Sequence, residues 1–147
     1  MQQLYKKIAD MNSRYYSLRG EIVTAERRIA ALNEKAGMWA QYRKYRPIRK
    51  QLDRVNPDKQ QLFWERHSRE LILYDAADRF LKGLKDNGEE LKPKEWKSEI
   101  ASLTAEKDSK YTEMRAMREE IKAAEQLKKT AERLAREQNT QTHDPER

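Results

Sequence analysis

The chain contains no cysteine and little glycine, proline or phenylalanine. The lack of cysteine excludes a disulfide framework, thiol catalysis and cysteine-ligated zinc. It also suits a reducing compartment, so we expect a cytoplasmic protein. No apolar run approaches the roughly 20 residues that cross a bilayer, and the first residues, MQQLYKK, contain no apolar signal core. We therefore expect a soluble protein with no membrane association.

Charge is what the sequence has in abundance. Charged residues make up 39% of the 147 residues and apolar residues 37%, against about 25% and about 45–50% in ordinary domains. This composition is typical of long helices that bury a narrow stripe. The net charge of +7 is uneven, because residues 1–56 contain 13 Lys/Arg and 5 Asp/Glu, residues 57–92 contain 7 and 8, and residues 93–147 contain 12 and 12. An electrostatic partner is therefore expected at the first third of the chain.

A regular apolar stripe occupies the first forty residues. Its members are spaced alternately four and three residues apart, which is the a/d pattern of a coiled coil sustained for five heptads. They are Leu4, Ile8, Met11, Tyr15, Leu18, Ile22, Ala25, Ile29, Leu32, Ala36 and Trp39. We call this set the seam. A helix of this kind is stable only when a partner covers its stripe.

Proline and glycine predict where the helices begin and end. Pro47 removes a backbone donor and biases Arg46 away from helical angles, so a first helix is expected over residues 1–45 and a short helix over residues 48–55. The pair Asn56-Pro57 is typical of a helix start, which predicts a second main helix over residues 57–84. Gly88 suits a left-handed helix end. Pro93 is then expected to begin a last helix that reaches about residue 138, and a disordered tail is expected over residues 139–147.

The last helix also has heptad-like apolar spacing, but with interruptions. Lys107 falls on a seam position, and the steps to Tyr111 and Leu127 shift the phase. We interpret these irregularities as stutters and stammers, which are local changes of supercoil.

These elements predict an all-α protein, built as a long antiparallel coiled-coil hairpin with a small helical head. The whole forms a single helical domain, residues 1–138, made of the first coiled-coil helix (1–45), the head (46–92) and the last coiled-coil helix (93–138). The alternative is an intermolecular coiled coil, so the chain is a monomer or a coiled-coil dimer. Intramolecular pairing is favoured because closing one chain on itself loses less entropy than bringing two together.

The strongest local signal for function is a cluster of basic and aromatic residues. Six Lys/Arg and one acid occur between positions 42 and 54. Basic side chains displace counterions from phosphates, and aromatic rings stack on exposed bases. The candidate nucleic-acid-binding residues are Tyr42, Arg43, Lys44, Tyr45, Arg46, Arg49, Lys50 and Arg54. In the competing interpretation the tyrosines belong to the core of the head and the cations form a solvated rim.

No pattern of catalytic or metal-binding residues emerges. His67 and His143 are far apart in the sequence, and no set of His, Asp and Glu has metal-ligand spacing on one helix face. Gly-rich phosphate loops and nucleophile-elbow motifs do not occur. We therefore expect no catalytic residues, no metal and no cofactor, and a protein that is not an enzyme.

The order of several short segments resembles the C-terminal helical region of relaxases, the mobilisation nucleases of conjugative plasmids and integrative elements. These segments are AERRI at 25–29, YRKY at 42–45, HSRELILYDAA at 67–77, FL at 80–81 and KP at 92–93. The resemblance covers roughly residues 20–135. It implies an accessory part of a relaxase that holds DNA beside the nuclease or docks onto other proteins of the transfer complex.

The catalytic tyrosine and the metal-binding histidine cluster of relaxases have no counterpart in this chain, so none of the family's catalytic residues is assigned here. Two hypotheses follow. The first is a relaxase-associated module that binds DNA through residues 42–54. The second is a coiled-coil protein-interaction module with no nucleic-acid role.

Overall fold

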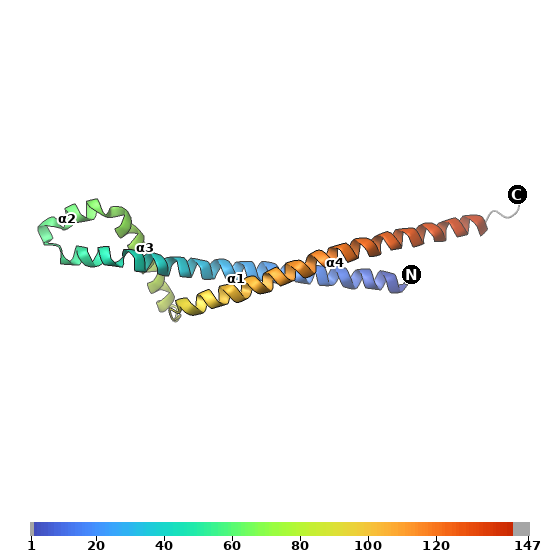
Figure 1. Cartoon of the computed structure of the whole chain (residues 1–147), viewed down its shortest axis with the longest axis horizontal. Helices are drawn as coiled ribbons and strands as arrows, with labels where there is room; N and C mark the ends of the chain where they lie inside the picture. Colours follow the sequence, from blue (N-terminus) through green and yellow to red (C-terminus); the bar gives the residue numbers. More distant parts are fainter. Residues whose placement is uncertain (1, 143–147) are drawn as a thin grey trace. The chain divides into compact units, whose positions relative to one another are not determined.

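The computed structural model describes residues 2–142, with side chains through residue 139, and every element within them is an α-helix. The helices are α1 (Gln2–Arg54), α2 (Pro57–Arg66), α3 (Ser68–Asp86) and α4 (Pro93–Thr142), as Figure 1 shows. The predicted all-α class is confirmed.

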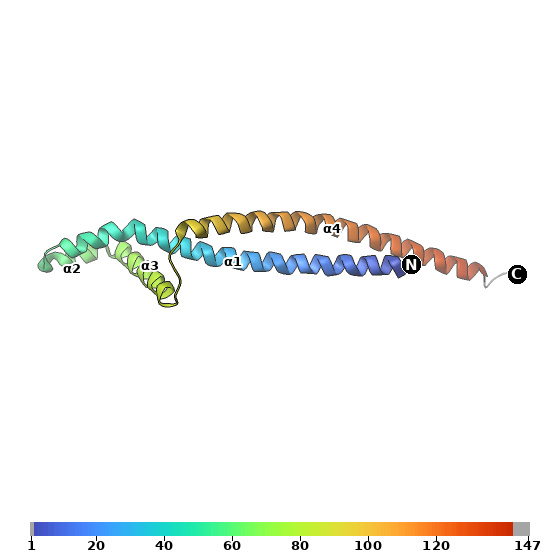
Figure 2. The same cartoon turned by 90° about the horizontal axis from the view of Figure 1, so that it is seen from below.

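The chain divides into two compact units, and both long helices contribute to each of them. Unit 1 contains the described parts of residues 1–26 and 105–147, and unit 2 contains residues 27–104. In each unit α1 and α4 lie side by side in both views (Figures 1 and 2). That the chain works as one domain over residues 1–138 stays a prediction.

Side-chain contacts within unit 1 run in antiparallel order. The Tyr5 hydroxyl donates to Glu132 at 2.8 Å, the Arg14 guanidinium lies 3.3 Å from the Glu113 carboxylate, and the Tyr111 hydroxyl donates to Glu26 at 2.7 Å. Contact positions rise along α1 while they fall along α4, as the predicted hairpin requires. A supercoil of the two helices stays a prediction.

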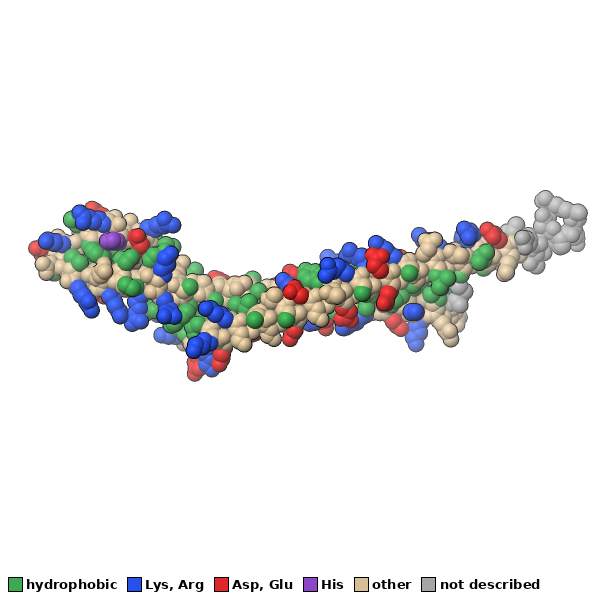
Figure 3. Space-filling model, viewed as in Figure 1, with side chains coloured by type: hydrophobic (Ala, Val, Ile, Leu, Met, Phe, Trp, Pro, Cys, Tyr) green, Lys and Arg blue, Asp and Glu red, His purple; other side chains and the backbone are tan. Residues whose placement is uncertain are grey.

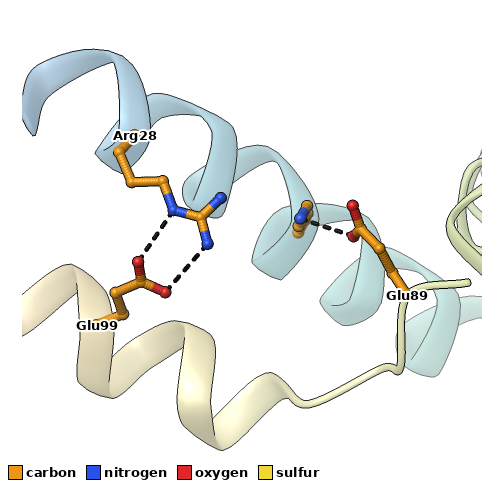
Figure 4. A network of polar contacts seen from close by, with 4 residues as sticks. Arg28, Glu89 and Glu99 are labelled. Atoms are coloured by element: carbon orange, nitrogen blue, oxygen red, sulfur yellow. Dashed lines mark hydrogen bonds and ion pairs between the residues drawn. The ribbon is translucent and has the colours of Figure 1, made fainter. Parts of the chain in front are cut away.

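In unit 2, α1 makes two further polar contacts, one to the start of α4 and one to the loop before α4. Arg28 forms a two-pronged contact with Glu99, at 2.9 and 3.2 Å, and Lys35 lies 2.8 Å from Glu89 (Figure 4). An exposed pair such as Arg28–Glu99 contributes less than about 1 kcal/mol. It therefore aligns α1 and α4 more than it stabilises them.

The seam on α1 faces inward, as predicted. Its residues are all buried or half-buried, and Leu18 and Leu32 have no exposed surface at all. Burying a leucine fully contributes on the order of 2 kcal/mol. The seam therefore supplies the main hydrophobic contribution of α1.

The predicted phase shifts in the last helix are wrong. Buried and half-buried positions on α4 follow an unbroken spacing of four and three, with Lys107, Lys110 and Lys128 in the line. Tyr111 and Leu127 are instead 38% and 58% exposed. A lysine can lay its aliphatic stem along an apolar surface and keep its ammonium in water. The helix therefore keeps its phase at positions where apolar patterning alone indicates a shift. The positions in this line are Trp96, Ile100, Leu103, Lys107, Lys110, Met114, Met117, Ile121, Ala124, Lys128 and Ala131.

The predicted helix end at residue 45 is also wrong, because α1 continues through Pro47 to Arg54. The predicted helix over residues 48–55 is the last part of α1, so the predicted head (46–92) begins inside this helix. An interior proline removes one backbone hydrogen bond and disturbs one carbonyl. Packing of the residues before and after Pro47 outweighs that cost, because Tyr45 and Ile48 are half-buried and Leu52 is buried.

The predicted helix over residues 57–84 is divided in two at His67, which ends α2 and begins α3 with φ −119° and ψ 26°. The His67 ring lies on Phe63, with centroids 4.5 Å apart. A break without glycine or proline leaves no signal in the sequence. Asn56 and Pro57 do begin α2, as predicted, and Pro93 begins α4.

The last two helices end within four residues of the predicted positions. Gly88 adopts φ 83° after α3, which confirms the predicted left-handed position. Helix α4 reaches Thr142 rather than residue 138. Residues 139–142 of the predicted disordered tail are therefore helical, and its residues 143–147 lie outside the described part.

Candidate nucleic-acid interface

The last part of α1 packs one side against α3. Half-buried or buried residues recur every three or four positions along this side, and the Gln41 side-chain amide donates to the Leu73 carbonyl oxygen of α3 at 2.6 Å. We call this set the α3-facing stripe. It consists of Met38, Gln41, Tyr45, Ile48 and Leu52, and Val55 continues the spacing just after the helix.

Four cations form a separate line on α1, which we call the basic stripe. Arg43, Arg46, Lys50 and Arg54 are all exposed and, at 3.6 residues per turn, lie within about 80° of the helix surface. The line is roughly 16 Å long, about the axial length of five nucleotides of one DNA strand. Figure 3 shows Lys and Arg side chains gathered along the edge that this part of α1 forms.

The basic stripe continues the direction of the seam. Ala36 and Trp39 point the same way as Arg43 on a regular helix, and α4 begins beside them, because Pro93 lines a groove with all three. Helix α4 therefore covers the seam only up to this point. Beyond it, the same side of α1 is exposed and basic.

The other two predicted cations lie outside the basic stripe. The Lys44 ammonium lies 5.3 Å from the centre of the Tyr45 ring. Arg49 pairs with Asp53 at 3.7 Å, one helical turn away. The structure therefore brings four of the six predicted cations together.

The two predicted tyrosines take part in packing. The Tyr42 ring stacks on Trp39, with centroids 5.9 Å apart, and on Tyr74, at 5.2 Å, while Arg46 lies 5.8 Å from its centre. Tyr45 belongs to the α3-facing stripe. Burial, and then the neighbouring Tyr42 hydroxyl, raise the pKa of Tyr74 to about 12. For these rings, the geometry matches the interpretation as core of the head.

A groove of about 920 Å³ lies where α4 begins beside α1. Trp39, Ala36, Ala40 and Pro93 supply its apolar surface. The acidic residue Glu95 is 3.7 Å from Lys92, which also pairs with Glu90. Five cations line the same groove: Arg43, Lys44, Lys92, Lys94 and Lys97.

Sequence reasoning missed the α3-facing stripe and the cations that α4 contributes. The stripe was detectable, since its spacing of three and four begins at Met38, but the longer seam overlaps it. Lys94 and Lys97 are more than 40 positions from Arg43. Only the folded chain brings them to the same groove.

Two further properties concern the described residues alone. Residues 2–142 contain no group of three or more His, Asp and Glu placed to hold a metal ion. None of their helices combines the length and the apolar character that crossing a membrane requires.

Comparison with protein-family models, curated proteins and solved structures found no match. We therefore infer function from the residues of this chain. Their charge is concentrated in unit 2, whose sequence holds 18 Lys/Arg and 12 Asp/Glu, whereas that of unit 1 holds 14 and 13.

Proposed function

We propose that this protein is a non-catalytic helical module that binds DNA through the basic stripe. The observation behind this proposal is the line of four exposed cations on the side of α1 that α4 leaves uncovered. Cations spaced along a helix displace counterions from successive phosphates, which gives binding without base-specific contacts.

The distribution of charge supports the same proposal. Unit 2 has an excess of six positive charges and unit 1 an excess of one. A concentrated positive field raises the rate at which a polyanion associates. Unit 2 is therefore the part of the molecule that meets DNA.

The biological setting we propose is conjugative DNA mobilisation. The resemblance to the helical region of relaxases supports it, and the basic stripe overlaps the YRKY segment of that resemblance. In this setting the module holds DNA next to a nuclease domain and performs no chemistry of its own.

The test is DNA binding by fluorescence anisotropy across 50–200 mM salt. Reversing three stripe charges, in Arg43→Glu/Lys50→Glu/Arg54→Glu, removes three phosphate contacts. The negative slope of log affinity against log salt is expected to become shallower by about 2.7 for duplex DNA. The matched control, Arg19→Glu/Arg115→Glu/Lys129→Glu, makes the same charge change at exposed positions of unit 1. An equal loss in both variants would attribute binding to net charge and reject the stripe.

A second candidate function is protein interaction through α4. Leu127 and Leu134 are 58% and 49% exposed, and their seven-residue spacing places them on one side of the helix. A partner helix that covers them would dock the chain onto another protein of a transfer complex. A partner retained after nuclease treatment, together with no salt-dependent DNA affinity, would favour this function over the first.

A further inference from the structure

We propose that the groove at the start of α4 binds an unpaired nucleotide, with its base on Trp39 and its phosphates at Lys94 and Lys97. The site gives the protein a preference for single-stranded over duplex DNA. This inference rests on the proposed DNA binding, because the groove then extends the basic stripe.

Trp39 is suited to hold a base. It is the end member of a ring stack, since Tyr42 stacks on it and Tyr74 stacks on Tyr42. Trp39 lines the groove, and the two tyrosines do not. The ring is half-buried and is held by its packed neighbours, so a base stacking on it would order few additional groups.

The charges around Trp39 select an anion. Lys94 and Lys97 come from the first two turns of α4, and the positive end of the helix dipole adds to the attraction at Lys94, in the first turn. Glu95 opposes them, but it is 3.7 Å from Lys92 and its charge is partly balanced. A ligand with a flat ring and flanking negative charges matches both the apolar floor and the basic walls.

Arg43 connects the groove to the basic stripe, because it belongs to both. A strand that follows Arg54, Lys50 and Arg43 therefore reaches Trp39 at its end. In a duplex the base at that point is paired and stacked inside the helix, whereas in a single strand it is free to stack on protein. The geometry thus distinguishes the two forms of DNA.

The experiment measures the affinity of the full chain for a labelled 15-nucleotide strand and for the same sequence as duplex. Trp39→Leu is expected to weaken single-strand binding about 10-fold and to change duplex binding less than 3-fold. Lys94→Glu/Lys97→Glu is expected to weaken single-strand binding at least 10-fold. Trp39→Phe keeps a stacking ring and is expected to retain most of the affinity. Trp64→Leu, in α2, and Arg115→Glu/Lys129→Glu, in unit 1, are the matched controls.

The outcomes separate this inference from the proposed function. In one outcome, Arg43→Glu/Lys50→Glu/Arg54→Glu weakens binding to both forms of DNA, while the Trp39 and Lys94/Lys97 variants bind like their controls. The groove is then not a nucleotide site, and the basic stripe is still a DNA-binding site. Loss of single-strand and duplex binding to the same extent in the lysine variant would also overturn the strand preference. If wild-type protein binds neither form, both proposals fail, and capture of an acidic peptide would identify a different occupant.

Discussion

At the scale of single residues, Tyr42 shows how one side chain takes a role that its neighbours in sequence do not share. It lies between Arg43 and Gln41, yet it packs on Trp39 and Tyr74 while Arg43 faces solvent. Adjacent helix positions point 100° apart. A segment rich in both tyrosine and arginine therefore divides into a packed side and a binding side.

Tyr74 is expected to make the free energy of unfolding depend on pH. Its pKa is raised from 10.0 to about 12, because burial first, then Tyr42 and Asp78 disfavour the phenolate, while Arg46 opposes them. The neutral ring is thus favoured in the folded state. Its contribution is complete below pH 10 and is lost as the pH rises toward 12, up to about 2 kcal/mol for a partly exposed ring.

Urea unfolding at several pH values from 8 to 12 measures this effect. In Tyr74→Phe the free energy of unfolding is expected to fall less steeply between pH 10 and 12 than in wild type. Tyr16→Phe, at a 63% exposed position, controls for loss of a tyrosine hydroxyl. Parallel curves for Tyr74→Phe and wild type would contradict the assignment.

At the scale of helices, the sequence predicted the seam, the starts at Pro57 and Pro93 and the end at Gly88, because each rests on local chemistry. It did not predict the continuity of α1 through Pro47 or the break at His67. Both depend on packing between segments distant in sequence, and tertiary contacts override local preference. For the candidate site, sequence alone indicated the cations of α1 but not the separation of Arg49 from the stripe or the contribution of Lys94.

Replacing Pro47, inside α1, is expected to stabilise the protein. Pro47→Ala restores a backbone donor within a helix that is already formed, so it is expected to raise the free energy of unfolding by about 1–3 kcal/mol. Pro57→Ala is the control, because Pro57 occupies the first turn of α2, where a proline costs little. Denaturant unfolding measures both. A destabilised Pro47→Ala protein would contradict this expectation and show that α1 depends on the proline ring.

At the scale of the whole molecule, α1 and α4 pair within one chain. The absence of cysteine makes this testable, because introduced cysteines are then the sole thiols. Arg14→Cys/Glu113→Cys places two thiols at a contacting pair. A short bismaleimide is expected to join them within one chain and give a product of monomer mass.

The control pair is Arg14→Cys/Arg133→Cys, in which the second cysteine lies about 30 Å farther along α4. It is expected to give little intramolecular product. Cross-linked dimer as the main product of Arg14→Cys/Glu113→Cys would instead support the intermolecular coiled coil. Electrophoresis under denaturing conditions and intact mass distinguish the two.

The polar pairs of unit 1 have a consequence for alignment. Arg14 lies beside Glu113, and Glu21 lies 3.9 Å from Lys110. Because the seam repeats every seven residues, α4 could slide by one heptad and still bury apolar side chains. A slide in one direction would bring Glu113 opposite Glu21, and a slide in the other would bring Lys110 opposite Arg14. Each misaligned hairpin would bring like charges together, so weak surface pairs discriminate among registers that the hydrophobic seam alone leaves nearly equivalent.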